Sequence, residues 1–385
     1  MLHILIYESM YRSFRQPCAV PAKKLELCST RTSTVIKVTT DSQPGTLLDD
    51  MNRIMIREIA KSFDDLQPPR GEKRKVGMYM WVRDSITRTT TKSVYGPMSP
   101  YEDKAIADAF CQPSLTARKL IAAQSRVSDA FQEYYKAGGV DKASALTRMR
   151  YQVEVDHNVP LEDIARYEVG GSIAVLFNTA PNRLLHRIVA IDEDRYYDQD
   201  LGCDNSGRKV PFTSVSVSGR SPTSMGTSVR EVMEDTLLEG FLLKKGTMLQ
   251  MPSRIIHQDT DLWSADVTQF NPRRFLPEEK KNRPSEACFR AFGGGKTLCP
   301  GRHFATNEIL AVVAVFIARF DMKPLEGDWR HPSTINTNVA AVVMEPDDDI
   351  EVEVETRKGF EDVDWEIKLH KSEKIFAMVT EDNEG

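Results

Sequence analysis

Apolar positions recur at helical spacing over most of the first half of the chain. They follow one helix face through Leu47–Phe63. The same spacing resumes near Met78–Tyr95, Glu102–Phe110 and Ser114–Tyr135, and prolines or a glycine pair separate these segments. A polar stretch with two prolines, residues 64–75, interrupts the pattern after the first segment. The spacing therefore predicts a series of amphipathic helices joined by short breaks.

A longer helix is expected from about Leu161 to Asp192, beginning after Pro160. Its middle, residues 170–177, consists of small and apolar side chains, so this helix should be buried on most sides. Pro181 removes a backbone hydrogen bond and should kink the helix. The pattern thus predicts a long, buried and bent helix in the middle of the chain.

Short strands and turns replace the helical pattern beyond Arg230. Gly246 and Pro252 bound short β segments, and residues 350–355 alternate apolar and acidic side chains like a half-buried strand. The longest apolar run, Ile309–Ala318, has ten residues and indicates a buried helix, because a membrane span needs about 20. The chain is therefore expected to be mainly α with a small β portion.

The pattern also divides the chain into regions. Residues 1–45 show no sustained period, and we expect an irregular or poorly ordered arm with at most a strand or two. Residues 46–366 are expected to form one domain, and residues 367–385 a C-terminal tail. Within the domain, residues 196–224 are rich in Ser, Gly and Asp without a period, which is unusual for a loop of a compact domain.

Composition and charge exclude several classes of protein. The 385 residues are 41% hydrophobic and 28% charged, and 51 Lys and Arg against 56 Asp and Glu leave a net charge of -5. This balance gives no reason to expect a nucleic acid partner. The six cysteines are dispersed, without a CxxC pair or zinc-finger spacing. The first residues make a poor signal peptide, so reduced thiols and an intracellular location are expected.

One glycine-rich segment carries the strongest chemical signal. Residues 289–304 read Phe-Arg-Ala-Phe-Gly-Gly-Gly-Lys-Thr-Leu-Cys-Pro-Gly-Arg-His-Phe, and the helix expected over Gly301–Arg319 follows. Glycines let a backbone lie close to a flat ligand. Cys299 falls just before the positive end of this helix, which favours the thiolate form. A thiolate binds soft or borderline metals, haem iron included. The alternative is a glycine-rich turn with an inert, buried cysteine.

This segment resembles the haem-binding loop of the cytochromes P-450. The family signature F-x-x-G-x-x-x-C-x-G is matched at its four anchors, Phe292, Gly295, Cys299 and Gly301. Upstream, residues 270–275 resemble the family's meander motif, and the resemblance covers about residues 50–366. It implies the cytochrome P-450 fold and bound haem b (iron protoporphyrin IX). Cys299 would be the proximal iron ligand, in a loop shaped by Phe292, Gly295 and Gly301.

Two further residues resemble family positions at the edge of the haem. Arg230 stands where an Arg commonly meets a haem propionate through a charge-assisted bond. A solvated strand Arg is the alternative. Trp81 resembles the Trp of the family's C helix that packs near a propionate, although Ser85 replaces the usual Arg four residues later. Arg83 and Arg88 are candidates to replace that Arg, or are simply solvated helix charges.

The long helix expected after Pro160 resembles the I helix, which crosses the distal face of the haem. Asn178 and Thr179, followed by Ala180-Pro181, stand where most members carry an acid–Thr pair. The resemblance implies that Thr179, with Asn178 and water, lines the oxygen site. This variant is similar to the branch containing sterol 7α-hydroxylases and prostacyclin synthase, with fungal relatives. Asn cannot exchange a proton as a carboxyl group can, which leaves room for isomerase chemistry. Alternatively, Asn178 only bonds backbone groups freed at the kink.

Two family features are missing from the sequence. Neither a membrane anchor nor a Pro-rich hinge is recognisable, so we expect a chain that is N-terminally truncated or comes from an incomplete gene model. The Glu-x-x-Arg motif of the K helix, expected shortly before Arg230, is also missing, and residues 196–224 stand in its place. Some codons for residues 218–222, read one base later, spell Gln-Glu-Asp-Leu-Arg. A frame error is therefore a hypothesis that the nucleotide sequence would test.

The resemblance implies a haem-thiolate monooxygenase that inserts one oxygen atom from O2 into an apolar small molecule. A sterol, a terpenoid or another secondary metabolite of fungal type would be the substrate. Electrons would come from NADPH through a partner NADPH-cytochrome reductase. The family suggests the endoplasmic reticulum membrane, although no anchor is present. A haem-thiolate isomerase or dehydratase that needs no reductase, and an inactive truncated relative, are the alternatives.

Overall fold

The computed structural model describes residues 47–111, 117–176, 227–267, 285, 288–290, 292–294, 298–329, 333, 346–363 and 365–367. The expected N-terminal arm, residues 196–224 and the expected tail beyond residue 367 lie outside this part of the chain. The expected division into arm, domain and tail therefore stays a prediction.

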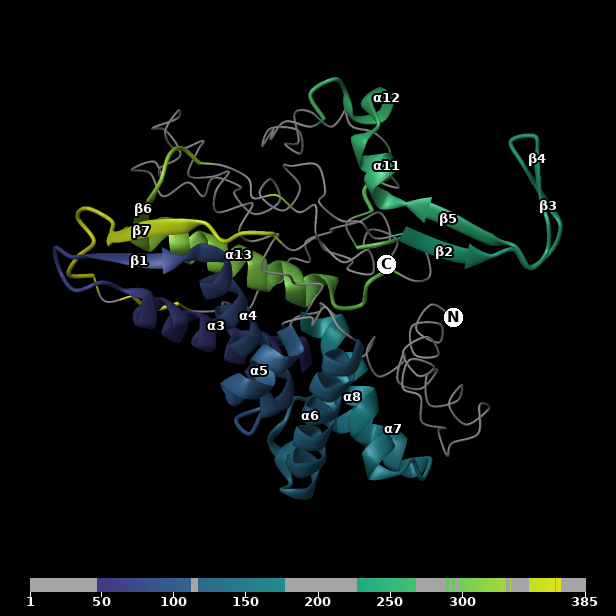
Figure 1. Ribbon diagram of the computed structural model, residues 1–385, viewed down its shortest axis with the longest axis horizontal. Coiled ribbons are helices and arrows are strands. Elements are labelled where there is room, and N and C mark those ends of the chain that lie inside the picture. Colours follow the sequence, from purple (N-terminus) through teal and green to yellow (C-terminus); the bar gives the residue numbers. More distant parts are fainter. Residues whose placement is uncertain are drawn as a thin grey trace.

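The described residues are mainly helical with small sheets, as the sequence pattern predicted (Figure 1). In chain order the elements are α3 (Leu47–Leu66), β1 (Lys73–Gly77), α4 (Met78–Tyr95), η1 (Pro100–Glu102), α5 (Lys104–Cys111), α6 (Ala117–Lys136), η2 (Gly139–Lys142), α7 (Ala145–Asp156), α8 (Leu161–Leu176), β2 (Thr227–Glu231), β3 (Thr236–Leu238), β4 (Phe241–Leu243), β5 (Met248–Pro252), α11 (Ser253–Gln258), α12 (Thr260–Trp263), α13 (Arg302–Arg319), β6 (Phe320–Pro324) and β7 (Glu351–Thr356).

The expected helices are present, with local reasons for their ends. Gly96 follows α4 with φ 76°, and its N–H donates to the carbonyl of Lys92 at 3.0 Å. The description of α8 ends at Leu176, so the rest of the long helix expected to residue 192 lies outside the described residues. Helix α7 was not predicted. Its start has a local cause, because the Ser144 side chain accepts a hydrogen bond from the backbone N–H of Thr147.

The strand expected at residues 350–355 is present as β7, in a small antiparallel sheet of the order β1-β7-β6. Strand β1 was not predicted, because it lies at the end of the polar stretch 64–75. Strand β7 is central and alternates as predicted, with Val352 and Val354 fully buried. The pairs β2–β5 and β3–β4 form two separate two-stranded antiparallel sheets, and β3 and β4 lie between β2 and β5 in the chain. The β3–β4 hairpin extends away from the helices in Figure 1, and Leu237 and Phe241 on it are exposed.

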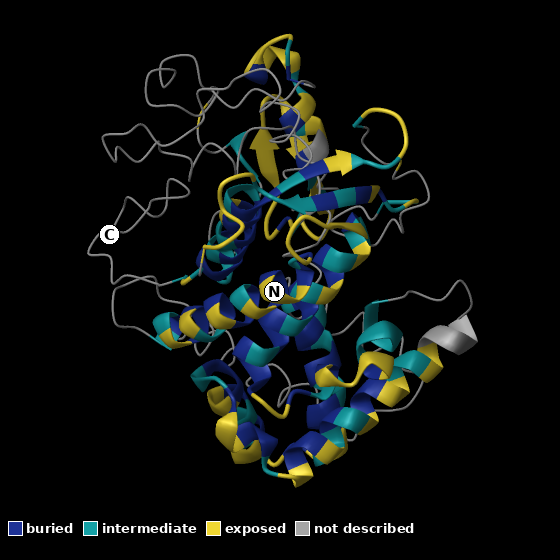
Figure 2. Ribbon diagram, turned by 90° about the vertical axis from the view of Figure 1, so that its left-hand side faces the viewer, coloured by how far each residue is buried: buried dark blue, intermediate teal, exposed yellow. Residues whose placement is uncertain are grey.

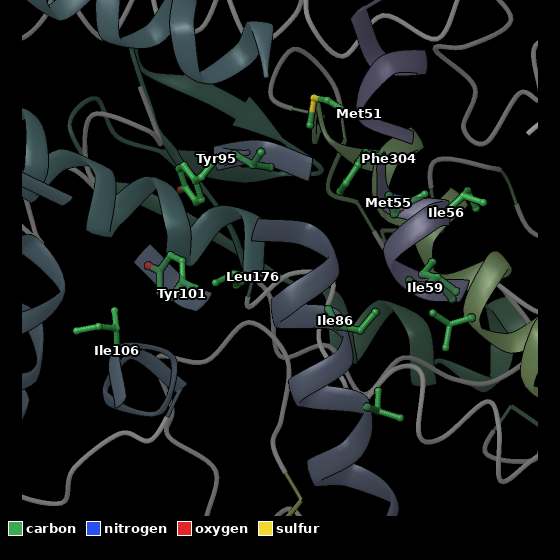
Figure 3. Close-up of a cluster of buried hydrophobic side chains, with 14 of the residues drawn as sticks. Met51, Met55, Ile56, Ile59, Ile86, Tyr95, Tyr101, Ile106, Leu176 and Phe304 are labelled. Atoms are coloured by element: carbon green, nitrogen blue, oxygen red, sulfur yellow. The ribbon is translucent and has the colours of Figure 1, made fainter. Parts of the chain in front are cut away.

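One hydrophobic core joins the helices to the three-stranded sheet. Side chains of α3, α4, α8 and α13 meet in it, among them Met55, Ile86, Leu176 and Phe304 (Figure 3). Helix α13 packs against α3 and is buried on most sides. The outer faces of the helices carry the exposed residues, which Figure 2 shows in yellow. Burial of these apolar faces stabilises the fold by about 25 cal/mol for each Å² removed from water.

A buried polar cluster ties α4, α6, α7 and α8 together. Arg150 of α7 pairs with Glu168 of α8, with Nη2 at 3.0 Å from Oε2. The hydroxyls of Tyr95 and Tyr135 donate to the two oxygens of Glu168 at 2.8 and 3.2 Å, and the Tyr95 hydroxyl also lies 2.9 Å from that of Ser172. Burial of such a charge pair is tolerated when its hydrogen-bonding groups are satisfied. The cluster therefore fixes the arrangement of four helices.

Candidate haem-thiolate site

The loop before α13 is closed by its own backbone. The N–H of Cys299 donates to the carbonyl of Phe292 at 3.0 Å, and the N–H of Gly293 donates to the carbonyl of Arg290 at 3.1 Å. Gly293 has φ 82°, a conformation that favours glycine. The Phe292 side chain is buried and anchors the loop. These contacts hold Cys299 immediately before the helix.

Cys299 is partly exposed, and its sulfur lies near the start of α13. Gly301 is the N-cap of this helix, and a Cβ at that position would lie 4.0 Å from the sulfur. The backbone N–H of Arg302 donates to the carbonyl of Cys299 at 3.4 Å, so the loop is joined directly to the first turn. The positive end of the helix dipole favours a negative sulfur here. The arrangement therefore suits a thiolate that binds a group placed against the loop.

A metal at this sulfur would need further ligands of its own. Among the described residues, no group of three His, Cys, Asp or Glu side chains is placed to hold a metal ion. Zinc sites in proteins use three or four such ligands. A single thiolate beside a glycine-rich loop instead fits a metal carried in a flat macrocycle, which supplies the remaining ligands.

The structure brings Arg230 to the same loop. Arg230 lies on β2, opposite Leu249 of β5, and is partly buried. One guanidinium nitrogen, Nη1, donates to the carbonyl of Val229 at 2.8 Å, and Nη2 reaches the carbonyl of Gly294 at 3.5 Å. The positively charged guanidinium group of Arg230 therefore lies beside the glycine-rich segment, where it could bind a carboxylate of a ligand. Its predicted role at a propionate stays a prediction.

The loop is supported by a histidine of α11, His257. The N–H of Arg290 donates to Nε2 of His257 at 2.7 Å. His257 is buried, and its ring lies 5.9 Å from that of Phe289. A Cβ at Gly294 would overlap the guanidinium of Arg290, so any larger residue there would have to displace that side chain. His257 thus holds one side of the loop in place.

Trp81 lies among aromatic rings of α3 and α13. Its ring packs against those of Phe63 on α3 and Phe316 on α13, with centroids 5.3 and 5.7 Å apart. Phe316 comes 14 residues after Arg302, which is about 21 Å along the helix axis. Trp81 therefore packs toward the end of α13 that is remote from Cys299. These contacts place Trp81 against the hydrophobic core, and its predicted role near a propionate stays a prediction.

The two arginines considered with Trp81 form ion pairs with carboxylates. Arg83 is buried and pairs with Asp84 at 2.7 Å and Asp108 at 3.2 Å. Arg88 pairs with Asp65 at 3.1 Å. Both therefore stabilise helix contacts, and neither replaces the missing Arg of the C-helix motif.

Several predicted site residues lie outside the described residues. These are Asn178, Thr179, Gly295 and the meander segment 270–275. Their predicted roles stay predictions. Of the predicted set, the described structure brings together Phe292, Cys299 and Gly301, with Arg230 beside them.

One buried acid on α13 was missed in the sequence. Glu308 is fully buried, and the hydroxyl of Thr90 on α4 donates to its Oε1 at 2.5 Å. Burial raises the pKa of Glu308 to about 8, and the Thr90 hydrogen bond opposes this effect. The carboxyl group is therefore neutral at pH 7. A single acid inside an otherwise apolar helix was the signal that could have identified it.

A mainly helical fold with small sheets, and a cysteine loop at the start of a buried helix, are typical of haem-thiolate proteins. The sequence profile described as Cytochrome P450 matches residues 220–352. The chain is 31% identical to Cytochrome P450 monooxygenase nodJ of Hypoxylon pulicicidum over 375 residues, covering 86% of this chain and 73% of the relative. It therefore belongs to the cytochrome P450 family, whose members are oxidoreductases with haem as cofactor.

The alignments with two other relatives cover a smaller share of the relative's length. A cytochrome P450 monooxygenase of Gibberella zeae is 25% identical over 334 residues, covering 74% of this chain and 64% of the relative. Cytochrome P450 monooxygenase calL of Penicillium decumbens is 35% identical over 141 residues, covering 32% of this chain and 26% of the relative. The monooxygenases that this chain resembles are thus from fungi in these three cases.

Two further findings concern the segment before Arg230 and the helices. The profile match begins at residue 220, within residues 196–224, where the Glu-x-x-Arg motif was expected. That segment lies outside the described residues, so the frame hypothesis stays a prediction. None of the helices in the described part of the chain is both long and apolar enough to span a membrane.

Proposed function

We propose that this chain is a haem-thiolate monooxygenase that inserts one oxygen atom from O2 into an apolar small molecule of fungal secondary metabolism. The observation that carries the proposal is the loop closed by the Cys299–Phe292 hydrogen bond at the start of α13. Cys299 is partly exposed, and its sulfur lies near the small residue Gly301. The relatives that are monooxygenases by name support the same reaction class.

The residues present fit haem. Cys299 would hold the iron, and Arg230 would bind a propionate from its position beside Gly294. Gly301 places no side chain beside the sulfur, and a Cβ there would lie 4.0 Å from it. When bound through a thiolate, haem supplies electron density that favours cleavage of the O–O bond. The protein's part is to keep the sulfur anionic and fixed, which the start of α13 and the Arg290–His257 contact do.

The distal side is proposed from the sequence. Thr179, with Asn178 and a bound water, would line the oxygen site and move a proton to it by way of the Thr179 hydroxyl. Both residues follow α8, whose described part ends at Leu176. The small and apolar residues before them are proposed to form one wall of the substrate site. A sterol or terpenoid would suit such a wall.

The proposed partners are O2, an apolar substrate and a flavin reductase that delivers electrons from NADPH. A place at the endoplasmic reticulum membrane and kinship with the sterol 7α-hydroxylase and prostacyclin synthase branch are part of the same proposal. The Asn178-Thr179 pair is the observation that favours that branch. It also supports the second candidate function, isomerisation or dehydration without a reductase, because Asn cannot exchange a proton as a carboxyl group can.

Turnover of the haem-loaded full chain separates these functions. Sterols and cyclic terpenoids would first be screened for a shift of the haem Soret band, which reports displacement of water from the iron. A substrate that shifts the band would then be incubated with a fungal flavin reductase, NADPH and isotopically labelled O2. The monooxygenase proposal predicts one labelled oxygen atom in the product and no product without NADPH. Product formed without NADPH would favour the isomerase, and no shift or product with any compound would favour the inactive relative.

A further inference from the structure

Helix α13 needs a means of fixing its axial position. Its residues are buried on most sides, so apolar contacts alone leave rotation and sliding weakly specified. The far end is held by Arg319, whose Nη1 lies 2.8 Å from Asp64 and whose Nη2 lies 3.0 Å from Gln67 on the chain at and after α3. Cys299 is attached at the opposite end, through the N–H of Arg302. Any shift of that end moves the sulfur.

A polar contact lies in the half of α13 that follows Cys299. Glu308 and Thr90 are both fully buried, and the Thr90 hydroxyl donates to Oε1 of Glu308 at 2.5 Å. The other carboxyl oxygen, Oε2, has no hydrogen-bond partner within the described residues. Because burial raises the pKa of Glu308 to about 8, the group is neutral and no cation is required beside it. The contact is a neutral hydrogen bond between two helices in an apolar setting.

Such a bond exists in one register only. Sliding α13 by one residue moves it by about 1.5 Å and takes Glu308 away from the Thr90 hydroxyl. A carboxyl group left without any hydrogen bond in the core is costly, so other registers are disfavoured. Metal–ligand distances tolerate only about 0.2 Å of error. A register shift far smaller than one residue would therefore already displace the Cys299 sulfur from a bound metal.

We propose that Thr90 and Glu308 form a register lock, in which their hydrogen bond sets the axial position of α13 and thereby places Cys299 for its metal. Both are positioning residues, since they act through the helix and do not touch the cofactor loop. The proposal rests on the proposed function, in which the Cys299 thiolate is the iron ligand. Buried polar groups that fix the register of packed helices, at some cost in stability, are a known device.

Four variants of the full chain test the lock. Thr90→Val removes the donor while keeping the shape of the side chain. Glu308→Leu replaces the acceptor with an apolar group of similar size, whereas Glu308→Gln keeps an oxygen that can accept from Thr90. Thr91→Val is the matched control, because the Thr91 hydroxyl donates only within its own helix, to the carbonyl of Arg88 at 3.4 Å.

The first readout is the Soret band of the reduced, haem-loaded chain with carbon monoxide as probe. Thr90→Val and Glu308→Leu should lower the ratio of thiolate-type to unshifted absorbance about fivefold, the population change that corresponds to one ordinary hydrogen bond. Glu308→Gln and Thr91→Val should match the parent. A role in stability alone would change the melting temperature without changing this ratio in the folded protein.

The second readout needs no haem. The rate at which iodoacetamide alkylates Cys299 would be followed by peptide mass spectrometry in the haem-free chain, with Cys111 as internal reference. Thr90→Val should raise the Cys299 rate several-fold and leave Cys111 unchanged. An unchanged rate and an unchanged Soret ratio in Thr90→Val would overturn the lock, even if Glu308→Leu failed to fold. A parent without a thiolate-type band would instead overturn the proposed function, and the alkylation rates would still decide the lock.

Discussion

A methyl group added at Gly171 should destabilise the fold, although the same group added one residue earlier should stabilise it. Gly171 is buried on α8, and a Cβ there would overlap Nη2 of Arg150 and lie 3.1 Å from Oε1 of Glu168. The glycine leaves a notch on the helix into which the guanidinium fits. Gly170 is only half-buried, and its position points around the helix by about 100° from Gly171.

The magnitude follows from two opposing effects. Gly171→Ala must displace Arg150 and open the 3.0 Å pair with Glu168, and breaking a buried pair costs about 3–5 kcal/mol. Replacing a glycine by alanine within a helix stabilises it by about 1 kcal/mol. The net loss at Gly171 is therefore about 2–4 kcal/mol, whereas Gly170→Ala should gain up to about 1 kcal/mol. Both variants add the same atoms.

Chemical unfolding followed by far-ultraviolet circular dichroism measures the difference. The two midpoints should move in opposite directions from the parent, with slopes unchanged. Equal stability of the Gly171→Ala and Gly170→Ala variants would refute the notch and the importance of the pair. The double variant Arg150→Met/Glu168→Gln adds a second check, because removing both charges together should cost less than Arg150→Met alone.

Three further predictions concern other parts of the molecule. Burial raises the pKa of Glu154 from 4.5 to about 8, so this side chain keeps a proton in the folded chain that it loses in the unfolded chain. The folded state therefore loses up to about 5 kcal/mol of stability as the pH rises from 4.5 to about 8, and Glu154→Gln should remove this loss in unfolding titrations. Trp81→Ala should destabilise the fold by about 3 kcal/mol without changing the Soret band, because Trp81 packs on Phe63. A shifted Soret band in this variant would instead support the predicted position of Trp81 near the haem. Arg230→Ala should weaken haem retention in gel filtration more than Arg230→Lys does, and equal retention would contradict its propionate role.

Much of the fold was predictable because its signals are local. The helices α3, α4 and α6 and the strand β7 follow from periods that a short window reveals. Helix α7 was missed because charged residues, Arg150 and Glu154, occupy part of its buried face and interrupt the apolar pattern, and the Ser144 cap marks its start. The pattern of a segment predicts its type, but packing against other segments decides whether a weak pattern folds.

The candidate site shows the same division. The Cys299 loop was identified because its signature lies within a few consecutive residues. The contacts of Trp81 with Phe63 and Phe316 could not be predicted, because a short resemblance to one helix does not say which helices will surround it. The Thr90–Glu308 bond joins positions 218 residues apart, so no spacing rule could reveal it.

The central claim is that the Cys299 sulfur binds haem iron as a thiolate. The most direct measurement is the absorption spectrum of the reduced, haem-loaded chain under carbon monoxide, compared with that of Cys299→Ser. The account predicts a strongly red-shifted Soret band in the parent and no such band in the variant. An unshifted band in the parent, or a red-shifted band that persists in Cys299→Ser, would contradict it.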